Sequence, residues 1–106
     1  MHGVLKLHLP ARVPNEGARQ LARWVAFTHG GDLERAARVL WPTGPARMKG
    51  GFLQRIVSGE VVPSRVTGER MWRLFGLRAR MFAMPAAGGW LEAETSGWAD
   101  AGAVAA

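Results

Sequence analysis

The chain contains no cysteine, which excludes both disulfide bonds and thiolate metal sites. It also lacks an apolar run of the roughly 20 residues that a membrane-spanning helix needs. The opening residues, 1–10, are too short and too interrupted to form the apolar region of a signal peptide. We therefore expect a cytoplasmic protein without a membrane partner.

Catalytic and metal-binding sets are also missing. The three histidines are dispersed, and the acids stand singly, mostly at predicted helix starts or surfaces. Ser58, Ser64 and Ser96 have no histidine and aspartate nearby in the sequence. Residues 44–50 are rich in glycine, but they lack the Gly-Lys-Ser/Thr ending of a nucleotide-binding loop and follow a helix, not a strand. We predict no enzyme activity, no cofactor, no metal and no small-molecule ligand.

Acidic residues are few beside the basic ones, eight against 14, and the net charge is +6. All 14 lysines and arginines lie before residue 81 with five of the acids, so this part carries +9, whereas the part after residue 84 carries −3. A basic body is typical of proteins that bind polyanions. An arginine-rich proteome produces the same composition without that function, so charge alone does not decide.

The apolar spacing predicts a mainly α-helical fold, a bundle of four to five helices at residues 15–84. An N-terminal arm at 1–14 precedes it, and an Ala/Gly-rich tail at 85–106 follows. Leucines alternate with polar residues in 5–9, which indicates either a short half-buried strand or a chance pattern in a disordered terminus. The tail composition buries little, so we expect disorder or loose docking there, with Trp90, Leu91 and Trp98 as candidate anchors.

Capping residues predict where the helices begin and end. Asn15 starts a helix that runs to about His29, and Asp32 starts a second helix that Pro42 stops. Further along the chain, the helix signals are Ser64 or Thr67 as a start, Gly76 as an end, and residues 77–84 as a short helical turn.

The segment from residue 42 to 51 allows two interpretations. Its two prolines and three glycines are typical of a loop. Alternatively, Pro45 opens a longer helix over 45–58 with Gly50 and Gly51 inside it, at a cost of roughly 1 to 2 kcal/mol relative to alanine. Such glycines are tolerated where another surface comes close to the backbone. Gly59 ends the helix in the left-handed conformation in either case.

The order of these elements resembles the lambda-repressor/Cro-type (XRE-like) helix-turn-helix family over roughly residues 16–77. The matching positions are packing and capping residues, namely Leu33, Ala36, Ala37, Leu40, Leu53, Ile56, Gly59, Pro63 and Ser64. The connection between the two central helices is longer than the tight turn of that family. This departure leaves the base-reading positions open.

The resemblance implies a transcriptional regulator, a repressor of bacterial or phage origin, that binds a palindromic double-stranded DNA operator as a homodimer. Counted back from Gly59, the base-reading positions are Gly50, Gly51, Gln54 and Arg55. Glutamine suits adenine, and arginine suits guanine. The residues expected at DNA phosphates are Arg35, Arg47, Lys49, Ser58 and Arg65, and those expected at a dimer seam are Met81, Phe82 and Met84.

Several alternatives remain. Arg19 and Arg23, four residues apart, form either a solvated face or a phosphate contact. The residues of the proposed seam either form that seam or close the core of one copy. The rival function is a protein-interaction module, such as an antitoxin or a phage-encoded inhibitor. Non-specific or RNA binding is a third hypothesis, although the sequence lacks an aromatic-platform pattern.

Overall fold

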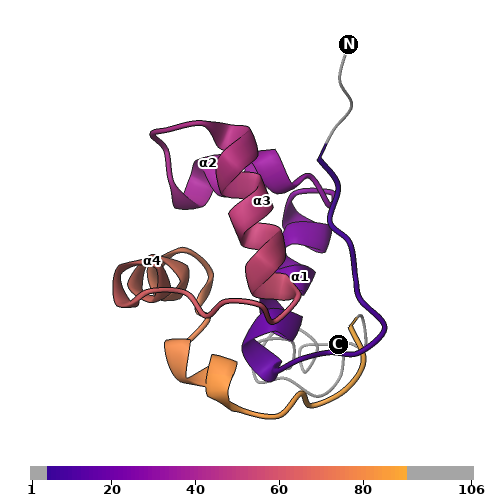
Figure 1. Cartoon of the computed structure of the whole chain (residues 1–106). Helices are drawn as coiled ribbons and strands as arrows, with labels where there is room; N and C mark the ends of the chain where they lie inside the picture. The colour runs from indigo at the N-terminus through magenta and orange to yellow at the C-terminus, as the bar shows by residue number, and fades with distance from the viewer. Residues whose placement is uncertain (1–4, 91–106) are drawn as a thin grey trace, which may run out of the picture.

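The computed structural model describes residues 5–90 (Figure 1). This part is mainly helical, as predicted, and it contains no strand. No helix in it is long and apolar enough to cross a membrane. α3 packs chiefly against α2 and less extensively against α1. The elements in chain order are α1 (Glu16–Thr28), α2 (Leu33–Leu40), α3 (Ala46–Val57), α4 (Arg65–Phe75) and the short 3₁₀ helix η1 (Ala79–Ala83).

Side-chain caps begin three of the helices where the sequence predicts them. Asn15, Asp32 and Ser64 each accept a hydrogen bond from the backbone N–H three residues later. These bonds satisfy donors that have no partner within the helix. After α3, Gly59 has a φ of 82°, the predicted left-handed stop. Gly76 ends α4 in the same conformation.

α3 begins directly after Pro45. Of the two interpretations of this segment, the longer helix that Pro45 opens is therefore the one that forms. Gly50 and Gly51 lie inside it. A Cβ atom at Gly50 would meet Leu5 Cδ2 at 3.0 Å and the backbone nitrogen of Glu34 at 3.3 Å, whereas one at Gly51 would meet nothing. The first glycine therefore lets α3 approach α2 closely, and the second leaves bare backbone toward solvent.

One core joins all four helices. Trp24 of α1 stacks on Phe75 of α4, with ring centroids 4.1 Å apart. Arg70 of α4 donates a hydrogen bond to the carbonyl oxygen of Leu40 at the end of α2. The apolar positions that the helical spacing places inside are buried, including Ala18, Leu21, Ala22, Val25, Leu33, Ala36, Ala37, Leu40, Leu53, Ile56 and Val57.

Residues 5–9 form an extended arm along the core. The arm pairs with the turn between α1 and α2 at a single bridge, Lys6 with Asp32. The side chain of Gln54 then exchanges two hydrogen bonds of 2.8 Å with the backbone of His8. The leucines of the arm are half-buried and the residues between them are exposed. The arm thus keeps the predicted alternation without forming a strand.

A buried polar cluster on α1 holds the segment after η1. Glu16 accepts hydrogen bonds from Arg19 at 3.0 Å and Gln20 at 2.9 Å, and all three residues are buried. Glu16 also accepts one from the backbone of Ala87 at 2.7 Å, while Arg19 donates to the carbonyl of Gly89 at 2.9 Å. The segment after η1 therefore docks on α1 through the carboxylate and the guanidinium together.

The described structure bears on three expectations. Arg19 and Arg23 are both buried, so neither a solvated face nor a phosphate contact describes them. Residues 85–90, assigned to the tail, belong to the folded body. Trp90 is an anchor, since its indole N–H donates to the carbonyl of Pro10 at 2.7 Å. The other two candidate anchors and the rest of the predicted tail lie outside the described residues.

Phe82 packs on the backbone of α1 within one copy of the chain. A Cβ atom at Gly17 would lie 2.4 Å from the Cγ of the Phe82 ring. Phe82 is buried in the core of one copy, which leaves its side chain little surface for a dimer seam. Met81 is half-buried against the same core, and Met84 is exposed. The homodimer itself stays a prediction.

Candidate nucleic-acid interface

The outward face of α3 carries Arg47, Gly51 and Arg55, spaced four residues apart. The two arginine side chains are 57% and 56% exposed. Residues four apart lie one above another on a helix surface. Two guanidinium groups therefore flank the bare backbone at Gly51, where another surface can approach closely. We call these three residues the outer face of α3.

Two residues predicted to read bases lie elsewhere. Gly50 is buried between α2 and the arm, where a base has no access. Gln54 is half-buried and, besides its two bonds to His8, donates to the hydroxyl of Ser58 at 2.9 Å. All the polar atoms of the Gln54 amide thus have partners in the protein. This side chain would have to release the arm before it could pair with adenine.

Carboxylates accompany both arginines of the outer face. Arg47 donates to Glu34 of α2 at 2.9 Å, and the Nε of Arg55 lies 3.5 Å from a carboxylate oxygen of Glu60. Exposed ion pairs of this kind contribute only about 0 to 1 kcal/mol. A phosphate or a base edge can therefore replace the carboxylates at small cost.

The other residues predicted at phosphates are spread over three helices. Arg35 in the first turn of α2 and Arg65 at the start of α4 are exposed. Lys49 is less accessible, and its Nζ lies 5.5 Å from the centre of the Trp41 ring, a cation–π distance. Ser58 already accepts the bond from Gln54. Arg35 and Arg65 are thus open to an anion, whereas the other two have partners in the protein.

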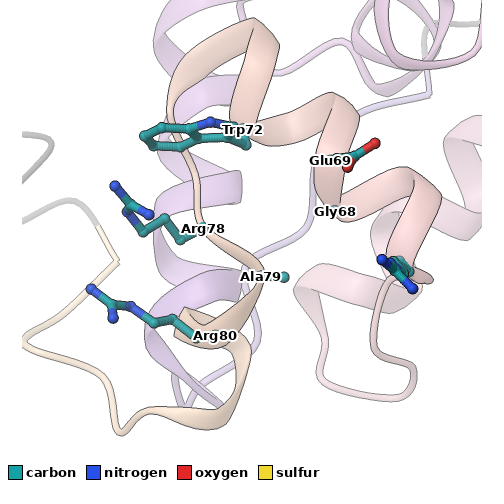
Figure 2. Close-up of a pocket in the computed structure, with 7 residues that line it drawn as sticks. Gly68, Glu69, Trp72, Arg78, Ala79 and Arg80 are labelled. Carbon is teal, nitrogen blue, oxygen red and sulfur yellow. The ribbon is translucent and has the colours of Figure 1, made fainter.

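A groove of about 340 Å³ lies between α4 and η1, and we call it the α4–η1 groove (Figure 2). Trp72 is 46% exposed, and the guanidinium carbon of Arg78 lies 4.2 Å from the centre of its ring. Figure 2 shows Trp72, Arg78 and Arg80 one below another along one side. The lining residues are Arg65, Gly68, Glu69, Trp72, Arg78, Ala79 and Arg80.

No sequence motif marks this groove. Trp72 falls within the apolar pattern of a helix, and Arg78 and Arg80 follow in an irregular segment. The available signal is Gly76, because a left-handed stop lets the next residues fold back over the last turn of the helix. As a helix end alone, Gly76 does not predict the groove.

His29, the C-cap of α1, is buried. Burial lowers the pKa of His29 below the ordinary imidazole value, the positive charge of Arg35 lowers it further, and Asp32 opposes both effects. Neither ring nitrogen has a hydrogen-bond partner within residues 5–90. The ring packs edge-on against Trp24, with centroids 4.5 Å apart. We therefore assign His29 to the core and not to the interface.

Comparisons with protein-family models, curated proteins and solved structures found no match to this chain.

Proposed function

We propose that the protein is a DNA-binding regulator of the helix-turn-helix class, with α3 entering the major groove of double-stranded DNA. The outer face of α3 carries this proposal, because Arg47 and Arg55 flank bare backbone at Gly51. The major groove admits an α-helix, and arginine pairs with both acceptors of guanine there. α2 packs behind α3, in the manner of a helix that supports a recognition helix.

The arginines take different roles in this proposal. Arg55 reads a base edge from the last turn of α3. Arg47 holds a phosphate at the start of α3, where free backbone N–H groups add to the attraction. Arg35 and Arg65 extend phosphate contact on the neighbouring helices. The net charge of +6 steers the protein toward DNA before contact.

Substitution of Arg55 tests the base-reading role. Arg55→Ala should weaken binding to a preferred duplex by about 1 to 3 kcal/mol and relax the preference at one base pair. Fluorescence anisotropy on DNA from upstream of the gene, beside a scrambled duplex, measures both effects. Arg73→Ala is the matched control, since Arg73 is exposed on α4 and also faces a carboxylate, Glu69, at 4.0 Å. Equal losses on both duplexes for Arg55→Ala would contradict the role.

One observation favours the rival function, a protein-interaction module. Trp41, Met48 and Phe52 line an apolar depression of about 330 Å³, and Met48 is 69% exposed. Apolar side chains gathered at a surface mark many protein contacts. If Met48→Ser reduces binding of a protein partner while the chain shows no affinity for DNA, this second function replaces the first.

A further inference from the structure

Three arginines and one acid, Glu69, line the α4–η1 groove, so its described lining is basic. Within residues 5–90, none of Arg65, Arg78 and Arg80 has a carboxylate at ion-pair distance. Glu69 also lines the groove, but its pair is Arg73, which lies outside the lining. Three arginines line this groove, and Arg78 and Arg80 lie on the side of Trp72 (Figure 2). Guanidinium groups attract anions, and their planar forks fit phosphate oxygens well.

The same groove presents an aromatic surface. Trp72 leaves nearly half of its large side chain in water, and Arg78 stacks on it. Nucleic-acid bases stack on exposed indole rings and on guanidinium planes. Arginines alone would suit inorganic phosphate, and an indole alone would suit an apolar ligand. A ligand that has both a planar ring and a phosphate uses both kinds of side chain.

The dimensions of the groove limit the ligand. Its volume of about 340 Å³ is near the lower end of small-molecule sites, which span roughly 300 to 1,000 Å³. At its floor, a Cβ atom on Gly68 would lie 3.1 Å from the Cβ of Ala79, so α4 and η1 touch there. A ligand therefore lies across the groove and does not pass between the two elements. A single nucleotide is of a size that such an open groove can hold.

We propose that the α4–η1 groove binds a single nucleotide, with its base against Trp72 and Arg78 and its phosphate among the arginines. The nucleotide is either free or an unpaired residue of a nucleic-acid strand, because the recognised chemistry is the same. The groove and the outer face of α3 share no residue. This inference therefore goes beyond the proposed binding of double-stranded DNA, with which the groove shares only Arg65.

The test uses the full chain and a fluorescein-labelled oligothymidine of about ten nucleotides, a length within the range that single-strand sites cover. Anisotropy is measured at about 50 mM salt, where phosphate contacts are strong. Trp72→Ala should weaken binding at least about fivefold, the lower limit for loss of one stacked base. Leu74→Ala should leave binding unchanged, since Leu74 lies on the same helix and is also 46% exposed.

A second pair of variants tests the charge. Arg78→Gln should weaken binding of the oligothymidine by more than Arg73→Gln, which removes the same charge outside the groove. Arg55→Ala should retain most of the binding, and this separates the groove from α3. If ATP displaces the oligothymidine, the groove also binds free nucleotides. If the oligothymidine binds and ATP does not displace it, the groove binds only nucleotides within a strand. Equal losses within each pair, or no binding of either probe, would overturn the inference.

Discussion

The outer face of α3 and the α4–η1 groove are both basic, but they hold their arginines differently. On α3, Arg47 and Arg55 each lie beside a carboxylate, and a glycine separates them. In the groove, Arg78 stacks on Trp72 and no carboxylate within the described residues balances its charge. The first surface is shaped for close approach, and the second for a planar anion. Net charge alone would not separate them.

The two surfaces also depend on different glycines. α3 is seated on α2 through Gly50, and η1 is seated on α1 through Gly17, on which the Phe82 ring packs. A substitution at Gly50 or Gly17 can therefore shift one surface while the side chains on that surface stay unchanged. Substitutions at these glycines should therefore affect duplex binding and oligothymidine binding differently.

Gly17→Ala should lower the free energy of unfolding by about 1 to 3 kcal/mol, as for overpacking of a core. The added methyl group would meet the Phe82 ring at 2.4 to 2.6 Å, which forces η1 away from α1. Urea unfolding measures the loss. Oligothymidine binding by the folded variant should fall more than duplex binding does. Unchanged stability would show that Phe82 does not pack on α1.

Gly50→Val should cost a similar amount, about 1 to 3 kcal/mol, for the same physical reason. The new side chain would press on Leu5 and on the α2 backbone, both near 3 Å from the added Cβ. Here duplex binding should suffer more than oligothymidine binding, the reverse of the previous variant. If both binding activities fall equally in the folded protein, the two surfaces are not separate.

Gly51→Ala should raise stability by about 0.5 to 1 kcal/mol, since alanine favours a helix and the site is open. It should nevertheless weaken duplex binding, because the methyl group occupies the gap between the two arginines. Thermal unfolding and anisotropy on one preparation measure the two opposite effects. A variant that is more stable and binds duplex fully would contradict the need for close approach.

Glu60→Gln should strengthen duplex binding by up to about fivefold, because it releases Arg55 from an exposed pair worth at most about 1 kcal/mol. Glu69→Gln is the matched control, since it releases Arg73 on α4. The comparison of the two variants on one duplex removes the general effect of one lost negative charge. An equal gain from both would leave Arg55 without a specific role.

The free energy of unfolding should depend on pH through the protonation of His29, which belongs to neither surface. Its pKa is lowered in the folded state, so the unfolded chain binds more protons below about pH 6.5, the ordinary imidazole value. Stability should therefore fall as the pH drops through that range and level off below the folded pKa. Urea unfolding from pH 7.5 downward measures this. In His29→Leu this part of the dependence should disappear, and its persistence would assign it to another group.

Local signals in the sequence predict the helices well, because caps and apolar spacing act within a few residues. Asn15, Asp32 and Ser64 begin helices as expected, and Gly59 ends one. The sequence is less informative about which side chains are free at the surface, because segments far away in the sequence can cover them. The arm occupies Gln54, a contact that spans 46 residues of sequence.

Distant contacts also explain the other differences. The segment around residue 89 covers Arg19, and the same docking brings part of the predicted tail into the fold. The turn at Gly76 brings Arg78 onto Trp72 and so forms a groove that no helical pattern contains. In each case the sequence shows the side chain itself, but it does not show which distant residue the side chain contacts in the fold.

The central claim is that α3 reads double-stranded DNA, and anisotropy of the unaltered protein on upstream and scrambled duplexes across a salt series tests it most directly. We expect a preference of about a thousandfold or more for one duplex. We also expect log K to fall with log salt by about 0.9 for each phosphate contact. Equal binding to both duplexes at every salt concentration, or no binding at low salt, would contradict the claim.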